Sequence, residues 1–106
     1  MFVVARGGEI AVNIEKAEKV QLAYHPVRES YSIEAVLSST GTTELDKYET
    51  FEYAQYAFYQ MILSITKGDK VFFMPTEREI VKEISTESIR EMMNKTPITV
   101  QKNEQG

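Results

Sequence analysis

The chain has 106 residues, of which 42% are apolar and 26% charged; this size and composition fit one globular domain and exclude wholesale disorder or a fibrous repeat. It contains no cysteine, which excludes disulfides and sulfur-ligated zinc sites. The net charge of −4 argues against nucleic-acid binding through many phosphate contacts, and no apolar run is long enough to span a bilayer, so we expect no membrane partner and a cytoplasmic location.

The first half of the chain has the pattern of an antiparallel sheet. Residues 2–6 and 9–14 are rich in strand formers, and Gly7-Gly8 between them predicts a two-residue hairpin turn. Three further strands are predicted over residues 19–24, 31–38 and 43–48. Along residues 31–38, apolar side chains alternate with polar ones, which is typical of a strand with one face in the core and the other in water.

The second half of the chain begins with a predicted helix. Apolar residues recur every three or four positions from Ala54 to Ile65, which indicates a helix that packs on a core. Thr50 can cap the start of this helix, and Gly68 can end it. A short apolar strand is predicted over residues 70–74.

A second helix is predicted after Pro75. Thr76 and Glu79 have the spacing of a capping box, in which two side chains bond free backbone N–H groups at the start of a helix. Propensity leaves two alternatives over residues 76–94, either one continuous helix or two helices with a new start at Ser85. Residues 1–95 are expected to form one domain, and the polar residues 96–106 to form a disordered C-terminal tail.

The order of these elements predicts an α+β fold. Five to six strands form a curled antiparallel β-meander, the long helix packs against it, and one or two shorter helices follow at the C-terminal end. Curling hides the strand edges, and the meander gives the apolar stripe of the long helix a face to cover.

A pattern of elements also resembles known proteins. It consists of the glycine hairpin over residues 2–14, the meander after it, and the segment from Tyr48 to Ala54 that runs into a helix ending at Lys67-Gly68. Over residues 1–74 this pattern is similar to small uncharacterised proteins of Gram-positive bacteria and their phages, and the resemblance implies a pleckstrin-homology-like (PH-like) layout. The region after Pro75 has no counterpart in that pattern, and the resemblance implies no catalytic or binding residues.

Two groups of charged residues could in principle carry chemistry. His25 is the only histidine, and we interpret it as a solvent-facing turn residue in preference to a general base. Glu44, Asp46 and Glu49 gather near the start of the long helix, but their spacing does not match a calcium loop. We therefore predict no catalytic residue, no metal ligand and no cofactor. The alternative is a small-ligand, metal-binding or enzymatic site that uses these carboxylates and His25.

A second alternative is a weak binder of anionic ligands such as nucleic acid or lipid head groups. It requires four basic residues to converge on one face, namely Arg6, Lys16, Lys19 and Arg28.

Aromatic residues around the long helix favour a different kind of function. Tyrosines crowd onto a flank beside its apolar stripe, so the helix carries more apolar area than one sheet face requires. We predict a non-enzymatic protein-interaction module whose partner is another protein or a second copy of the chain, as a homodimer. The opposing interpretation is that the C-terminal helices cover this flank. The predicted interface residues are Tyr53, Tyr56, Tyr59, Leu63, Ile89, Met92 and Met93.

Overall fold

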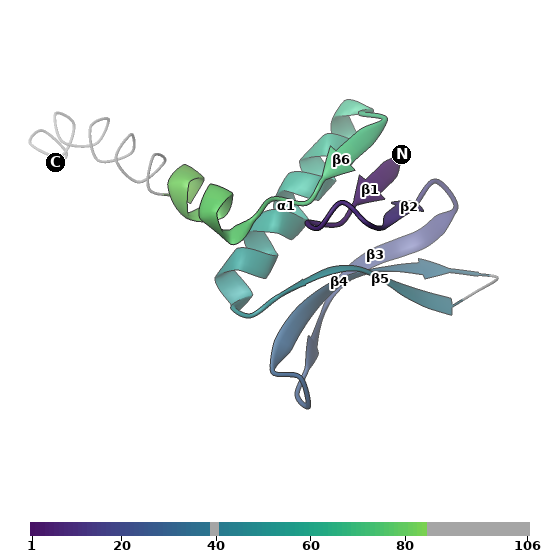
Figure 1. Ribbon diagram of the computed structural model, residues 1–106. Coiled ribbons are helices and arrows are strands. Elements are labelled where there is room, and N and C mark those ends of the chain that lie inside the picture. The colour runs from purple at the N-terminus through teal and green to yellow at the C-terminus, as the bar shows by residue number, and fades with distance from the viewer. Residues whose placement is uncertain (39–40, 85–106) are drawn as a thin grey trace, which may run out of the picture. The chain divides into compact units, whose positions relative to one another are not determined.

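The computed structural model describes residues 1–38 and 41–84 of the chain, which divides into two units, Met1–Thr76 and Glu77–Gly106. The first unit has an α+β fold, which confirms the predicted class (Figure 1). In chain order its elements are β1 (Phe2–Val4), β2 (Ala11–Asn13), β3 (Ala17–His25), β4 (Ser30–Leu37), β5 (Gly41–Tyr48), α1 (Phe51–Lys67) and β6 (Val71–Phe73). In the second unit, residues 77–84 are helical, as the capping box predicts.

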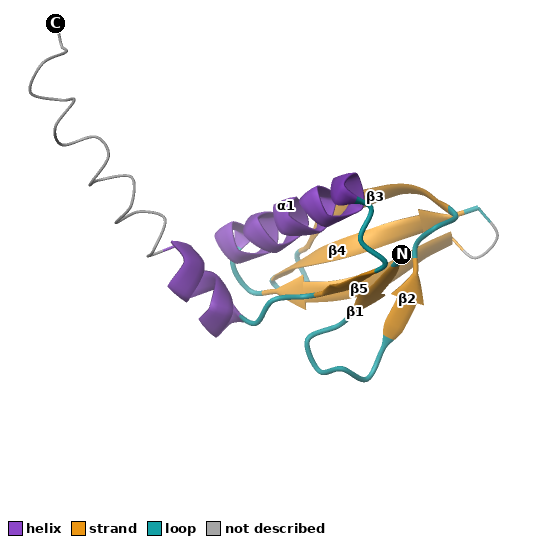
Figure 2. Cartoon of the chain, turned by 90° about the horizontal axis from the view of Figure 1, so that it is seen from above, coloured by secondary structure: helices purple, strands orange, loops and turns teal. Residues whose placement is uncertain are grey.

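Strands β3, β4 and β5 form one antiparallel sheet with β4 in the centre, which we call the meander sheet. Helix α1 lies along one face of this sheet (Figure 2). The contact is close, since side chains from both elements are fully buried in it. These are Ala54, Ala57 and Met61 of the helix and Ile33 and Ala35 of β4. Small side chains on the helix bring its backbone near the sheet, and the apolar stripe read from the sequence forms this core.

Both predicted ends of α1 are confirmed. The Thr50 side chain accepts a hydrogen bond of 3.3 Å from the backbone N–H of Tyr53. At the other end Gly68 has a left-handed conformation, with φ of 80°, and its N–H donates to the carbonyl of Ile65. A residue without a Cβ adopts this conformation at little cost, so the glycine ends the helix where the sequence predicts.

The remaining strands form a second sheet in the order β2-β1-β6, which we call the hairpin sheet. β1 and β2 pair antiparallel, whereas β1 and β6 pair parallel, with Val3 opposite Phe72. The six strands therefore form two three-stranded sheets, and the antiparallel meander is restricted to β3–β5. The parallel pair joins segments far apart in the sequence, and no local pattern of either segment indicates it.

Two local predictions are wrong. The link between β1 and β2 is not a two-residue turn, because residues 5–10 all lie between the strands, with the N–H of Gly8 donating to the carbonyl of Ala5 over 2.8 Å. Strand β4 does not have one wet face, because Ser32 and Glu34 are 0% and 6% exposed. β4 is the central strand, so its polar side chains are covered by those of both neighbouring strands.

Tyr48 connects the two sheets. Its ring is fully buried at the end of β5, and its hydroxyl donates a hydrogen bond of 2.7 Å to the carbonyl of Pro75, just beyond β6. This tyrosine therefore belongs to the core, unlike the tyrosines of α1. Among the described residues, no helix has both the length and the apolar character needed to cross a membrane.

Candidate functional site

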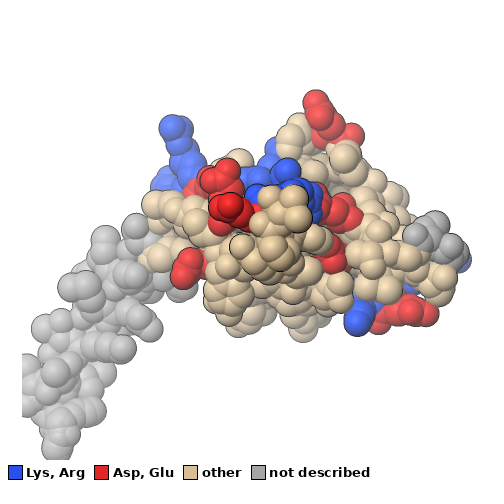
Figure 3. Space-filling view, turned by 90° about the horizontal axis from the view of Figure 1, so that it is seen from below, with Lys and Arg blue, Asp and Glu red and all other residues tan. Residues whose placement is uncertain are grey.

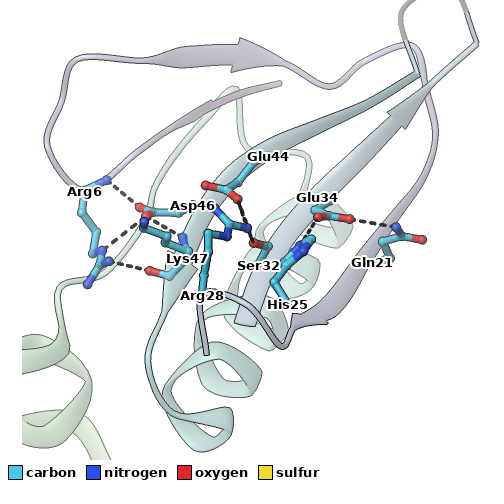
Figure 4. Close-up of polar contacts among 9 residues, drawn as sticks. All are labelled: Arg6, Gln21, His25, Arg28, Ser32, Glu34, Glu44, Asp46 and Lys47. Carbon is cyan, nitrogen blue, oxygen red and sulfur yellow. Dashed lines mark hydrogen bonds and ion pairs between the residues drawn. The ribbon is translucent and has the colours of Figure 1, made fainter. Parts of the chain in front are cut away.

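A first polar cluster lies on the face of the meander sheet turned away from α1 and centres on Glu34 (Figure 4). Glu34 is nearly buried, and its two carboxylate oxygens bond Gln21 Nε2 at 2.9 Å and His25 Nε2 at 2.8 Å. A buried carboxylate is stabilised when both of its oxygens have partners. The interpretation of His25 as a solvent-facing turn residue is wrong, since it is the last residue of β3 and is half-buried against Glu34.

A second polar cluster lies beside the first and centres on Glu44. The Ser32 hydroxyl and the Arg28 guanidinium donate to Glu44 Oε1 at 2.8 and 2.9 Å. Burial by itself raises the pKa of Glu44, but the hydrogen bonds from Ser32 and Arg28 and the charges of Arg28 and Lys47 together lower this pKa below its ordinary value of 4.5. The cluster therefore favours the charged form of Glu44.

A third polar contact fastens the loop after β1 to β5. The backbone N–H of Arg6 donates to Asp46 Oδ2 at 2.7 Å, and the Arg6 side chain lies 3.4 Å from Asp46 Oδ1. The guanidinium also lies 4.4 Å from the centre of the buried Tyr48 ring, which adds a cation–π contact. This contact holds the hairpin sheet against the meander sheet (Figure 4).

The described contacts distribute the residues considered in the sequence over separate clusters. Ser32 is bonded to Glu44 and His25 to Glu34, so the described contacts join no serine to the histidine. Glu44 and Asp46 lie in separate contacts, and Glu49 is exposed. Over residues 1–38 and 41–84, no three His, Asp or Glu side chains are placed to share a metal ion.

The four basic residues considered as an anion site do not converge. Arg6 and Arg28 are bonded to different carboxylates. Lys19 lies near the start of β3 and Arg28 beyond its end, which places their backbones about 20 Å apart at the rise of an extended strand. On the face drawn in Figure 3, Lys and Arg side chains lie among Asp and Glu side chains.

Four of the predicted interface residues lie on α1. Tyr59 and Leu63 are exposed, with 58% and 39% of their surface accessible, whereas Tyr53 and Tyr56 are half-buried. Only two of these four side chains are thus exposed, so α1 offers less apolar surface to a partner than the sequence predicts. The other three predicted residues, Ile89, Met92 and Met93, lie outside the described residues, as does the predicted tail.

The largest exposed apolar side chains that share a sheet face belong to the hairpin sheet. Each of its strands alternates, so Val3 and Phe72 point into the molecule and their neighbours point outward. Phe2, Val71 and Phe73 are 47%, 44% and 70% exposed. On the inner face, by contrast, Val3 is only 1% exposed. The outer face of the hairpin sheet, formed by residues 2, 4, 11, 13, 71 and 73, carries no ionisable side chain.

This face was missed in the sequence, although a signal was present. Residues 2–4 and 71–73 are apolar at every position, and continuous apolar strands are typical of sheets covered on both faces. Within residues 1–76, Val3 on the inner face is buried, whereas Phe2, Val71 and Phe73 on the outer face are exposed.

A hollow adjoins this sheet at β6. It has a volume of about 270 Å³ and lies between the strand and the C-terminal half of α1. It is lined by Gln60, Leu63, Ser64, Thr66, Lys67, Asp69 and Phe72. A larger hollow of about 430 Å³ lies near Ile14 and Ile65. Neither hollow is lined by the carboxylates or the histidine considered above.

Comparisons with known protein families, curated proteins and solved structures find no match to this chain.

Proposed function

We propose that this chain is a non-enzymatic protein-interaction module and that the partner is a second copy of the chain. The observation that carries the proposal is the uncovered apolar outer face of the hairpin sheet, with Phe2, Val71 and Phe73 exposed side by side. Burial of such side chains is worth about 25 cal/mol per Å² of apolar surface, and water gives them no compensating contact. An uncovered cluster of this kind is typical of a binding surface.

Charge supports a second copy as the partner. The chain has a net charge of −4, so two copies repel each other over most of their surfaces. The outer face of the hairpin sheet is neutral, and two copies that approach there bring no like charges together. The face is formed by residues 2, 4, 11, 13, 71 and 73, fewer than the roughly 20–30 residues a side of a standard stable interface, so we expect a dissociation constant in the micromolar range.

Size-exclusion chromatography with light scattering tests the proposal over a range of concentrations. We expect the apparent mass to rise with concentration toward twice the 12.2 kDa of one chain. The double variant Phe2→Ser with Phe73→Ser removes two exposed rings and should stay monomeric. A matched control is Val27→Ser, because Val27 is also apolar, is 98% exposed, and lies in the turn between β3 and β4.

Two results would overturn the proposal. One is a wild-type chain that stays monomeric at millimolar concentration. The other is a double variant that associates as strongly as the wild-type chain. If Leu63→Ser abolishes association while the Phe2 and Phe73 variants do not, the predicted helix flank is the contact surface instead.

A further inference from the structure

The β6 edge of the hairpin sheet is not paired with another strand of the described residues. β6 is the last strand of the order β2-β1-β6, so only one of its edges is paired within the described residues. On that edge the N–H of Phe2 donates to the carbonyl of Lys70, and the N–H of Met74 donates to the carbonyl of Val4, both at 2.9 Å. A parallel ladder uses alternate residues of a strand, so Phe72 completes this ladder. The N–H and C=O groups of Val71 and Phe73 therefore point to the open edge.

We infer that β6 pairs antiparallel with β6 of a second copy across a twofold axis at Phe72, which joins the two hairpin sheets into one continuous sheet. The inference rests on the proposed self-association and places the contact at the β6 edge of the hairpin sheet, where Val71 and Phe73 of the outer face, but not Phe2 on β1, lie next to the second copy. With Phe72 on the axis, Val71 lies opposite the partner's Phe73, and Phe73 lies opposite the partner's Val71. In an antiparallel pair, opposite residues that both direct their backbone groups toward each other exchange two hydrogen bonds. Among the twofold-symmetric registers, the one with its axis at Phe72 is thus the register in which the outward backbone groups of both Val71 and Phe73 are bonded.

The side chains at this edge fit the same arrangement. On the outer face, Phe73 is the most exposed phenylalanine at 70%, and pairing gives it the partner's Val71 as a cross-strand neighbour. On the inner face, Phe72 lines the hollow of about 270 Å³ between β6 and α1. The partner's Phe72 would lie beside this hollow and cover its apolar side, near Leu63. A strand that pairs with the β6 edge needs apolar side chains on both of its faces. β6 of a second copy has them in Val71, Phe72 and Phe73.

The edge also lacks the features that usually prevent strand addition. Natural edge strands are protected by a central proline, an inward charge or a bulge. Residues 71–73 contain no proline and no charged side chain, and their pairing with β1 runs without a bulge. In the symmetric register Lys70 falls opposite Met74 of the partner subunit, so the two lysines do not meet.

The substitution Val71→Pro tests the pairing directly. The Val71 N–H points to the open edge, so its loss removes no hydrogen bond from the β1–β6 ladder. It removes a donor from each copy at the dimer contact, and the proline ring blocks close approach. We expect the dissociation constant measured by light scattering to rise at least about tenfold, which corresponds to 1.4 kcal/mol. Val27→Ser is the control, and circular dichroism checks that each variant is folded.

Hydrogen exchange of the wild-type chain provides a second test that needs no variant. We expect the amides of Val71 and Phe73 to exchange fast in dilute protein and at least about tenfold more slowly when the dimer is populated, because only the dimer bonds them. The amide of Met74, which bonds Val4, is the internal control and should be protected at both concentrations.

The outcomes separate the two proposals. If the chain dimerises but the Val71 and Phe73 amides exchange equally fast at all concentrations, the β6 pairing is wrong and self-association stands. If Val71→Pro dimerises like the wild-type chain, the pairing is also wrong. If the chain is monomeric at millimolar concentration, both proposals are wrong. If Val71→Pro fails to fold, the exchange measurement decides.

Discussion

The meander sheet and the hairpin sheet carry opposite kinds of side chain on the faces turned away from α1. On the meander sheet, Glu34 and Glu44 each have hydrogen-bond partners within the same chain. On the hairpin sheet, Phe2 and Phe73 are exposed and have no polar atoms to satisfy. The polar side chains of the meander sheet are hydrogen-bonded within one copy of the chain. The exposed apolar side chains of the hairpin sheet have no such partners, and burying them against another surface lowers the free energy.

This difference indicates where function should be sought. The charged residues of the chain are conspicuous in the sequence, but in the structure Arg6, Arg28 and Glu44 are used to hold the fold together. The hairpin sheet has three strands of three residues each, and within residues 1–76 its outer face has exposed apolar side chains and its β6 edge is unpaired. These charged residues form contacts within the fold, and we propose the hairpin sheet as the binding surface.

The largest expected effect compares a covered residue with an uncovered one. Ile33→Ala removes a fully buried side chain between the meander sheet and α1, and we expect it to lower the free energy of unfolding by about 3 kcal/mol through lost burial and a cavity. Phe73→Ala should change the free energy of unfolding by less than about 0.5 kcal/mol, because the ring is 70% exposed. Urea denaturation of dilute protein, where any dimer is dissociated, measures both values.

A loss above about 1.5 kcal/mol for Phe73→Ala in dilute protein would break the comparison. It would mean that the outer face of the hairpin sheet is already covered within a single chain. Val27→Ser serves as the baseline for an exposed apolar side chain that contacts little.

The sequence predicts the elements better than it predicts their partners. Helix α1 follows from its apolar spacing and from Thr50 and Gly68 at its ends, because these signals are local. β5 forms in spite of weak strand formers, because β4 pairs with it along its length. The parallel pairing of β6 with β1 is not predictable from either segment, since it depends on how α1 returns the chain across the fold.

The site follows the same rule. His25 is read from the sequence as a solvent-facing turn residue, but its partner Glu34 lies on the neighbouring strand, and only the register of β3 on β4 brings them together. The PH-like resemblance and the predicted contact residues Ile89, Met92 and Met93 stay predictions.

A smaller effect is expected when the polar face of the meander sheet loses one partner. His25→Ala removes a hydrogen bond of 2.8 Å from the nearly buried Glu34 carboxylate and leaves Gln21 as its remaining described partner. We expect the free energy of unfolding at pH 7 to fall by about 2 kcal/mol, which is typical of a hydrogen bond to a charged group. His25→Gln, which keeps an N–H donor, should recover part of this loss. Urea denaturation of both variants measures the difference.

An unchanged free energy of unfolding for His25→Ala would weaken the contrast between the polar face of the meander sheet and the apolar face of the hairpin sheet. It would show that Glu34 is satisfied without the histidine, and that His25 is available for another role.

The smallest effect concerns the pH dependence of the Glu44 cluster. Burial acts to raise the pKa of Glu44, but Ser32, Arg28 and Lys47 together lower it below 4.5 in the folded chain, so the folded state holds the carboxylate more strongly than the unfolded state does. The resulting stability is fully present above about pH 5 and is lost as the pH falls through 4.5 toward the lower folded value. Glu44 is 37% exposed, so solvent screening limits the contribution to less than about 1 kcal/mol.

The variant Glu44→Gln cannot titrate, so its stability should fall less than that of the wild-type chain between about pH 5 and pH 3. The groups that face Glu44 are Arg28, Lys47 and Glu34, the last from the opposite position on β4, and none of them is altered in this variant. Glu49→Gln, which removes an exposed carboxylate outside the cluster, should keep the wild-type pH profile. Urea denaturation at several pH values measures the three profiles. Identical slopes for wild-type and Glu44→Gln would show that this part of the polar face contributes nothing to stability. The outer face of the meander sheet would then resemble that of the hairpin sheet, in that contacts within one chain do not stabilise it.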